Sequence, residues 1–171
     1  MPLNDIVYAK VSIHSRSASD RRPSPGQYSV GRVGQFWIGA DTLLADMLAE
    51  LLDAESIGYR LEVVGKAMCP RLHVDRVGIR LLCTYRGPGT EWVEDASVDR
   101  CFLGAAFGGL PDETSGLLLA GHRIETIPPF AVALLKGSLW QGNDGRGIVH
   151  RSPAVAAEQA PRVLLAMDAG W

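Results

Sequence analysis

The spacing of apolar residues predicts one helix, over residues 41–57. Asp41 stands at the position of an N-cap and Gly58 at that of a C-terminal cap. Between them, apolar side chains fall on one stripe at helical spacing: Leu43, Leu44, Met47, Leu48, Leu51 and Leu52. Such a stripe is typical of a helix that packs one face on a sheet.

From Tyr59 onward the pattern becomes that of strands. Residues 59–64 alternate apolar and polar side chains, and 79–85 form a second strand that the turn at 87–89 closes. Shorter strands are expected at 91–93, 117–119, 123–127, 130–135, 147–152 and 162–167. About eight short strands behind one helix favour a barrel or a double-sheet jelly roll over a parallel α/β sheet. The predicted fold class is therefore mainly β with a flanking helix.

The first part of the chain lacks any such pattern. Residues 14–26 are rich in Ser, Arg and Pro without an apolar period, which is typical of a loop or a disordered arm. A length of 171 residues suits a single domain. We therefore expect an irregular N-terminal arm over 1–34 and one domain over 35–171, in which the helix precedes the strands.

Charge and composition argue against several classes of function. Lys and Arg number 17 against 19 Asp and Glu, whereas nucleic-acid binders and polybasic membrane anchors need a basic excess. The longest uncharged apolar stretch, 101–110, is short of the ~18 residues of a spanning helix. The N-terminus lacks the apolar core of a signal peptide, and three cysteines are too few for a disulfide framework. We expect a cytoplasmic protein without a membrane partner or general nucleic-acid binding.

Two separated segments carry candidate metal ligands. His73 and Asp75 stand two apart, so that on a strand their side chains project to the same face. His150 follows much later, in an apolar strand. Two imidazoles and one carboxylate form the ligand set of a facial triad, which leaves open positions on a non-haem iron. The alternatives are a solvated surface pair for the first two residues and a core histidine bonded to backbone for the third.

A candidate anion site follows the distal histidine. Arg162 comes 12 residues after His150, on the next predicted strand, where a hairpin can bring it into the same cavity. A buried arginine needs an anionic partner, and the carboxylate of a bound acid would supply one in bidentate geometry. Arg151 is a rival, but strand parity turns it outward if His150 and Ser152 face in.

The strand at 79–85 offers two further candidates. Arg80, Leu82 and Thr84 alternate along it with the set Leu81, Cys83 and Tyr85, and one of these sets must line the cavity. Thr84 or Tyr85 could therefore hydrogen-bond a co-substrate carboxylate. The alternative is ordinary sheet packing with a satisfied hydroxyl.

The pattern His73-x-Asp75, His150 and Arg162 resembles the double-stranded β-helix oxygenases that use iron(II) and 2-oxoglutarate. The resemblance covers roughly residues 59–168. It implies a cupin-like jelly roll, with iron(II) on the three ligands and Arg162 on the far carboxylate of 2-oxoglutarate. Thr84, Tyr85 and Ser152 are then the further candidates for co-substrate binding. The chain departs from that pattern in lacking an Arg-x-Ser after the distal histidine.

A second resemblance covers most of the chain. Residues 69–92 (CPRLHVDRVGIRLLCTYRGPGTEW), 133–143 (ALLKGSLWQGN) and 149–153 (VHRSP) are similar to an uncharacterised bacterial family, domain of unknown function 1826. That family has no assigned activity. The resemblance implies a bacterial source and a link to zinc-responsive gene clusters, which offers a zinc interpretation of the same ligands.

Two hypotheses of function follow. The first is an enzyme, a metal-dependent oxygenase that uses iron(II) and 2-oxoglutarate to oxidise an unidentified small-molecule or peptide substrate. The alternative is a non-catalytic cupin-type metal-binding protein linked to zinc homeostasis, with the same ligands and Cys69 as a candidate addition. Imidazole and carboxylate accept zinc as readily as iron, and the affinity order favours zinc. Metal content and 2-oxoglutarate turnover separate the two.

Overall fold

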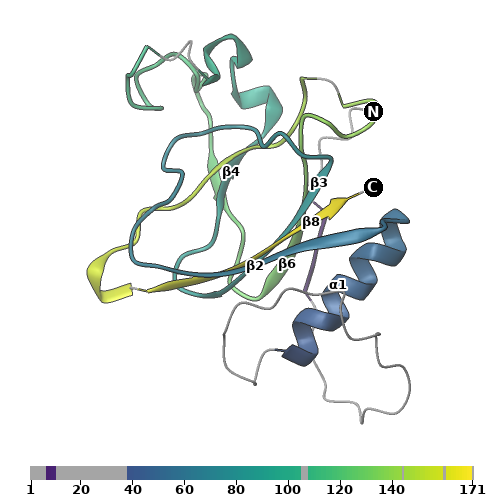
Figure 1. Ribbon diagram of the computed structural model, residues 1–171. Coiled ribbons are helices and arrows are strands. Elements are labelled where there is room, and N and C mark those ends of the chain that lie inside the picture. The colour runs from purple at the N-terminus through teal and green to yellow at the C-terminus, as the bar shows by residue number, and fades with distance from the viewer. Residues whose placement is uncertain (1–6, 11–37, 105–107, 144, 160, 171) are drawn as a thin grey trace.

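The computed structural model describes residues 7–10, 38–104, 108–143, 145–159 and 161–170, which form two antiparallel sheets and one α-helix (Figure 1). The large sheet has the strand order β1-β6-β3-β8-β2, and the small sheet the order β5-β4-β7. The elements are β1 (Val7–Lys10), α1 (Ile38–Leu52), β2 (Ser56–Val64), β3 (Ile79–Arg86), β4 (Glu91–Val93), β5 (Ile124–Thr126), β6 (Ala131–Lys136), β7 (Val149–Arg151) and β8 (Arg162–Gly170). The prediction of a mainly β chain with a flanking helix is confirmed for these residues.

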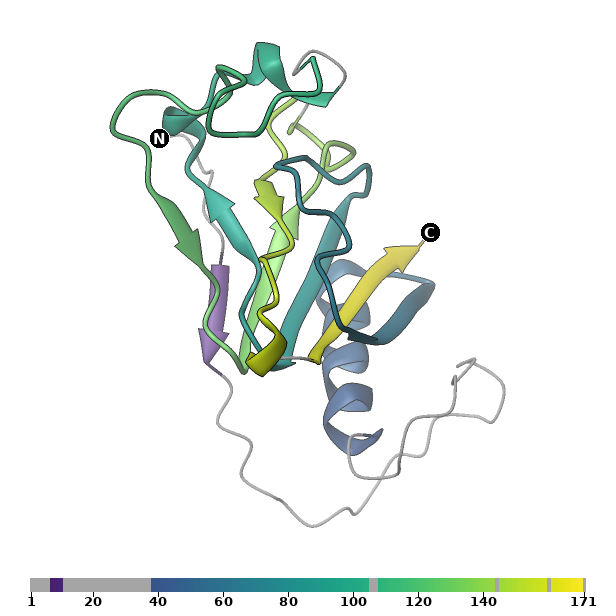
Figure 2. The same cartoon turned by 90° about the vertical axis from the view of Figure 1, so that its left-hand side faces the viewer.

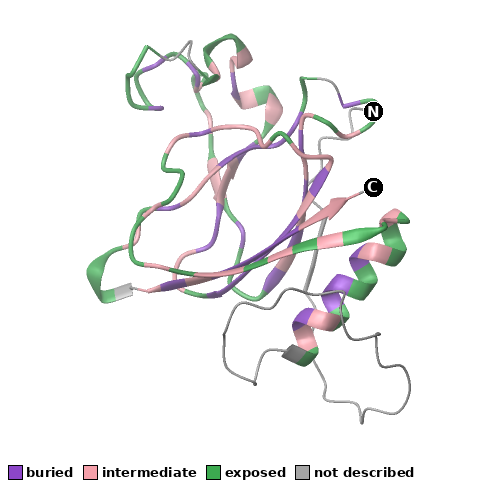
Figure 3. Ribbon diagram, in the orientation of Figure 1, coloured by how far each residue is buried: buried purple, intermediate pink, exposed green. Residues whose placement is uncertain are grey.

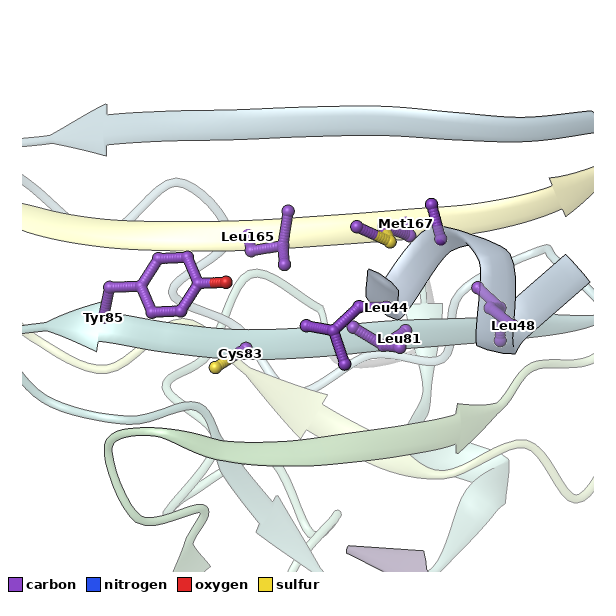
Figure 4. Close-up of a cluster of buried hydrophobic side chains, with 8 residues drawn as sticks. Leu44, Leu48, Leu81, Cys83, Tyr85, Leu165 and Met167 are labelled. Atoms are coloured by element: carbon purple, nitrogen blue, oxygen red, sulfur yellow. The ribbon is translucent and has the colours of Figure 1, made fainter. Parts of the chain in front are cut away.

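Both faces of the large sheet are covered, and for this reason β3 is buried along nearly its whole length (Figure 3). Helix α1 packs on one face, where Leu44 and Leu48 meet a layer from β3 and β8 that includes Leu81, Leu165 and Met167 (Figure 4). The small sheet lies in front of the other face in Figure 2, with α1 behind. Alternation along the strands thus separates a helix side from a side that faces the small sheet.

The layer between the two sheets is also apolar. Leu82 of β3 and Leu164 of β8 point into it from the large sheet, and Trp92 of β4 packs against the same cluster from the small sheet. The two sheets therefore enclose a core of their own, separate from the core under α1. Of the two sets that alternate along β3, the one with Leu82 and Thr84 faces the small sheet, and the one with Leu81 and Tyr85 faces the helix.

The helix begins and ends earlier than its sequence pattern predicts. It starts at Ile38, so Asp41 lies inside it, and it ends at Leu52. Asp53 follows with φ 50°, in the left-handed region where a helix can stop without glycine. Gly58, the predicted cap, lies in β2 opposite Asp168. The residues of β2 that precede Gly58 also pair with β8, which has nine residues. They therefore belong to the sheet and not to the predicted helix.

Asp41 anchors the helix to the large sheet instead of capping it. Its carboxylate is buried and accepts hydrogen bonds of 2.5 Å from the hydroxyls of Tyr59 and Tyr85. Burial and these bonds to the carboxylate raise the pKa of both phenols. The two hydroxyls therefore donate at every physiological pH.

Asp41→Ala should lower the free energy of unfolding by about 2–4 kcal/mol, because both tyrosine hydroxyls would lose their buried acceptor. Urea denaturation followed by circular dichroism measures the change. Glu50→Ala, on the exposed side of the same helix, is the matched control and should stay near the wild-type value. Equal midpoints for the two variants would show that the Asp41 contacts do not stabilise the fold.

Several strand predictions differ from the structure. Residues 117–119 form no strand, because only Leu118 makes a bridge, to Val98, while Leu117 packs on the outer side of the small sheet. The strand at 91–93 follows β3 after the turn at 87–89, as a return strand of a hairpin would, but it pairs with β5 and β7 in the other sheet. Within the expected N-terminal arm, β1 pairs with β6, and the rest of 1–34 lies outside the described residues.

The turn at 87–89 carries the chain from the large sheet to the small one. A Cβ on Gly89 would lie 1.7 Å from the carbonyl oxygen of Ile127, so only glycine allows this approach of the two segments. Among the described residues, no helix is long and apolar enough to cross a membrane.

Candidate metal centre

His73 and His150 face each other across a short backbone bridge at the edge of the small sheet. The N–H of His73 donates to the His150 carbonyl at 2.9 Å, and the N–H of His150 returns a bond of 3.0 Å. Opposite His150 on its other side is Trp92 of β4, which packs in the layer between the sheets. The imidazole of His150 therefore faces the large sheet, with the two histidine ring centroids 4.6 Å apart.

Asp75 completes a cluster of three. Its Oδ1 lies 3.5 Å from Nε2 of His73, and its Oδ2 lies 3.2 Å from Nε2 of His150. One ligand atom from each residue can be chosen so that all lie within 4.8 Å of one another. The segment from 73 to 75 is extended but makes a single bridge instead of a full strand. The structure thus brings together the three residues named from the sequence.

Hydrogen bonds to backbone carbonyls fix the orientation of both imidazoles. Nδ1 of His73 is 2.8 Å from the carbonyl of Arg71, and Nδ1 of His150 is 3.1 Å from the carbonyl of Ile148. A carbonyl oxygen can only accept, so each Nδ1 carries a hydrogen and the neutral ring keeps its lone pair on Nε2. Both lone pairs then point toward Asp75. This arrangement of a histidine tied to a carbonyl through its second nitrogen is the usual one in metal sites.

The charges around Asp75 favour its ionised form. Burial alone would raise the pKa of this carboxyl. The hydrogen bonds that His150 and His73 donate through Nε2 when their rings are protonated, together with the charge of Arg80, hold it well below its usual range. The bond to the same carboxylate raises the pKa of His73. Asp75 already pairs with Arg80, and the two imidazole lone pairs directed at its carboxylate favour a further cation between them, either a proton or a metal ion.

Two neighbouring segments hold the ligands in place. Buried Asp112 accepts bonds from the N–H of Leu72 and from Arg71, on the residues just before His73. The N–H of Ser138 donates to the carbonyl of Asp75 at 2.9 Å. Arg151, the rival anion binder, points away from the cluster and pairs with Glu91, Asp112 and Glu113. Its position agrees with the parity argument.

Gly137→Ala should disturb this support. An added Cβ would lie 2.2 Å from the carbonyl oxygen of Val77 and 2.8 Å from that of Asp75, both of them backbone atoms that cannot turn away. We expect a loss of about 1–3 kcal/mol in the free energy of unfolding, together with weaker metal binding. Gly39→Ala, with nothing within 4 Å of its Cβ, is the control and should be neutral or stabilising in denaturant titrations.

A cavity of about 100 Å³ opens beside the three residues. Leu82 and Leu164 of the large sheet and Thr90 are among the residues that line it, and Met68 and Cys69 stand on its solvent side with exposed side chains. The cluster therefore has an accessible space on one side, as a ligand or substrate would need.

Arg162 is buried next to this cavity and has no carboxylate partner among the described residues. Its Nε donates to the carbonyl of Pro88 at 2.9 Å, and its Nη2 donates to the hydroxyls of Thr84 and Thr90 at 3.2 and 2.8 Å. Nη1 makes no hydrogen bond to the described residues. Burial lowers the pKa of Arg162 to about 10, and the charge of Glu62 only partly offsets this.

The other candidates for co-substrate binding separate into two groups. Thr84 bonds Arg162 on the cavity side, and Ser152 lines the cavity. The hydroxyl of Tyr85 instead bonds Asp41 under the helix, on the opposite face of the large sheet. Tyr85 therefore does not share the cavity, because adjacent residues of a strand point to opposite faces.

Sequence reasoning missed three residues of this site. Arg80 was placed on one of the two alternating faces but given no role, although it bonds Asp75. Asp168, its partner, lies on the last strand, and only the register of β3 with β8 brings the two together. Asp112 lies in a connecting segment without strand or helix pattern. Parity along β3 could have indicated Arg80, whereas nothing in the sequence indicates the other two.

The chain belongs to the family described as a protein of unknown function (DUF1826), whose model matches residues 10–168. This match confirms the resemblance to the uncharacterised family. No curated protein and no solved structure shows a significant match to the chain. The likeness to the iron(II) and 2-oxoglutarate oxygenases therefore rests on this chain's own residues.

Proposed function

We propose that this protein is an oxygenase that binds iron(II) through His73, Asp75 and His150 and uses 2-oxoglutarate as its co-substrate. The observation that carries the metal site is the convergence of a carboxylate and two carbonyl-oriented imidazoles within 4.8 Å. Imidazole and carboxylate in a 2:1 set are ligands of non-haem iron(II). Bound iron would supply the reaction of dioxygen and 2-oxoglutarate that oxidises the substrate.

The arrangement of the chain supports an open site. All three candidate ligands come from β7 and the segment bridged to it, and they line a cavity that residues of the large sheet also line. Two antiparallel sheets with an apolar layer between them also support the finer fold assignment, a cupin-like double-stranded β-helix.

Arg162 supports the choice of co-substrate. It is 2% exposed and lacks a carboxylate partner in the described part of the chain, and its Nη1 makes no hydrogen bond to the described residues. A pKa of about 10 for a guanidinium means that its site disfavours the charge by about 3 kcal/mol, which a bound carboxylate would offset. The hydroxyls of Thr84 and Thr90 lie beside the same guanidinium and could donate to that carboxylate.

A zinc-binding role without catalysis is the second candidate. Cys69 lines the same cavity as the three ligands and is a free, exposed thiol. A thiolate would add a soft ligand that suits zinc. In this case Arg162 would have no function at the site, and 2-oxoglutarate would not bind.

Turnover separates the two candidates. The iron(II)-loaded protein, supplied with 2-oxoglutarate, dioxygen and a reductant such as ascorbate, should form succinate and carbon dioxide even without its substrate, at a slow uncoupled rate. In that case the reductant supplies the two electrons that convert the second oxygen atom to water. The zinc-loaded protein is the control and should form neither succinate nor carbon dioxide. An iron-loaded protein that forms no succinate would favour the zinc-binding role.

Removal of the metal should also destabilise the fold. The ligands come from chain segments far apart in sequence, so a bound ion cross-links them and favours the folded state by mass action. We expect the thermal midpoint to rise on addition of iron(II) or zinc and to fall again with excess chelator. Identical midpoints in all conditions would mean that the cluster binds neither ion.

A further inference from the structure

Arg80 connects the ligand cluster to the large sheet. Its Nη1 donates to Oδ2 of Asp75 at 2.6 Å, while its Nε and Nη2 donate to the two oxygens of Asp168 at 2.6 and 2.7 Å. Arg80 and Asp168 are directly opposite in the register of β3 and β8. This bidentate pair is therefore held on two adjacent strands, and the third guanidinium nitrogen, Nη1, bonds the carboxylate of Asp75.

This contact distinguishes the two oxygens of Asp75. Arg80 occupies Oδ2, so Oδ1 remains the less encumbered oxygen for a metal ion. A carboxylate held in this way binds a metal through one oxygen more readily than through two. The coordination position that a second oxygen would take then stays open for another ligand.

We propose that Arg80 is a positioning residue that holds Asp75 as a ligand through one oxygen; this inference rests on the proposed metal site. The positive charge of Arg80 would by itself repel a metal ion. However, Asp168 neutralises that charge at hydrogen-bond distance, so the pair acts mainly through its geometry. Outer contacts of this kind typically change metal affinity by about 10–100-fold.

The neutral pair suggests a test in which the charge at the site is kept. Arg80→Met alone would leave Asp168 negative beside the cluster, with only the more distant Arg60 as a partner. That charge would attract a cation and mask the loss of positioning. The double variant Arg80→Met with Asp168→Asn removes both charges together. Arg60→Met is the matched control, because among the described residues Arg60 lies 4.0 Å from Asp168 and makes no hydrogen bond to Asp75.

The measurement is a titration with Co²⁺ in competition with a chromophoric chelator, together with the visible spectrum of the cobalt protein. We expect the double variant to bind Co²⁺ about tenfold or more weakly than wild type, with an altered spectrum as Asp75 becomes free to use both oxygens. Arg80→Lys keeps a charged donor but cannot form the bidentate contact with Asp168. Its affinity for Co²⁺ should therefore lie between those of wild type and the double variant. The control should match wild type in both respects.

The outcomes separate this inference from the proposed function. Wild-type protein that binds no Co²⁺ would contradict the metal site and the role of Arg80 together. Wild-type binding, with equal or tighter binding and the same spectrum in the double variant, would overturn the role of Arg80 alone. If the double variant lacks the circular dichroism of the folded metal-free protein, Arg80→Lys decides, and wild-type affinity in that variant would overturn the inference.

Discussion

His150→Ala should lower the affinity for iron(II) or Co²⁺ by more than about 100-fold, beyond what the loss of an outer contact causes. His150 is 5% exposed and directs Nε2 at the cluster, so its replacement by alanine removes one of only three candidate protein ligands. Anaerobic competition with a chromophoric chelator measures the affinity. Asp75→Asn, which keeps the volume of the side chain, should show a loss of similar size.

His122 provides the matched control for these variants. It is a partly exposed histidine whose Nδ1 also lies near a backbone carbonyl, that of Leu119, but it belongs to no group of three metal-ligating side chains among the described residues. His122→Ala should bind metal as wild type does. Unchanged affinity in His150→Ala, with its fold intact, would contradict the metal site.

Arg162→Met should abolish 2-oxoglutarate binding while metal binding persists. The variant removes the one buried guanidinium beside the cavity that lacks a carboxylate partner in the described structure, and it leaves all three metal ligands in place. Loss of a charge-assisted bidentate contact inside a buried site costs about 3–5 kcal/mol, which is more than a hundredfold in affinity. Arg162→Lys should keep only part of the affinity for 2-oxoglutarate, because an ammonium group cannot form the bidentate contact with a carboxylate.

Calorimetric titration of the zinc-loaded, catalytically inert protein with 2-oxoglutarate measures this loss. Arg60→Gln is the control for charge at the cavity, since Arg60 lines the same space with an exposed side chain. It should retain most of the affinity. If Arg60→Gln lost as much affinity for 2-oxoglutarate as Arg162→Met, the general positive charge near the cavity, and not a specific contact with Arg162, would account for binding.

The local sequence pattern predicted most of the strands but not how they pair. The alternating residues 59–64 and the apolar residues 79–85 correspond to β2 and β3. A strand buried on one face has alternating polarity, and a strand buried on both faces is apolar throughout. The sequence pattern does not predict the end of the helix at Leu52. The leucine stripe is followed closely by the start of β2, and Asp53, not a glycine, adopts the left-handed conformation that ends the helix. Sheet membership of β4 depends on long-range pairing that no local pattern records.

The candidate site was predictable where spacing within one segment decides geometry. The same-side placement of His73 and Asp75 follows from their two-residue separation, and the outward direction of Arg151 follows from its place next to His150. Tyr85 could not be assigned in the same way. The alternation of side chains along β3 shows only that Tyr85 and Thr84 point to opposite faces of the sheet. Which face borders the cavity depends on where α1 packs, and the sequence does not show this.

The most direct test of the account is an anaerobic titration of the iron(II) protein with 2-oxoglutarate, followed by absorption spectroscopy. A 2-oxo acid that chelates iron(II) in an open site gives a metal-to-ligand charge-transfer band, which zinc cannot give. We predict that this band appears and saturates in the wild-type protein and is absent from Arg162→Met, although that variant still holds iron. A wild-type protein that binds iron(II) at His73, Asp75 and His150 but shows no band at saturating 2-oxoglutarate would contradict the assignment as an oxygenase.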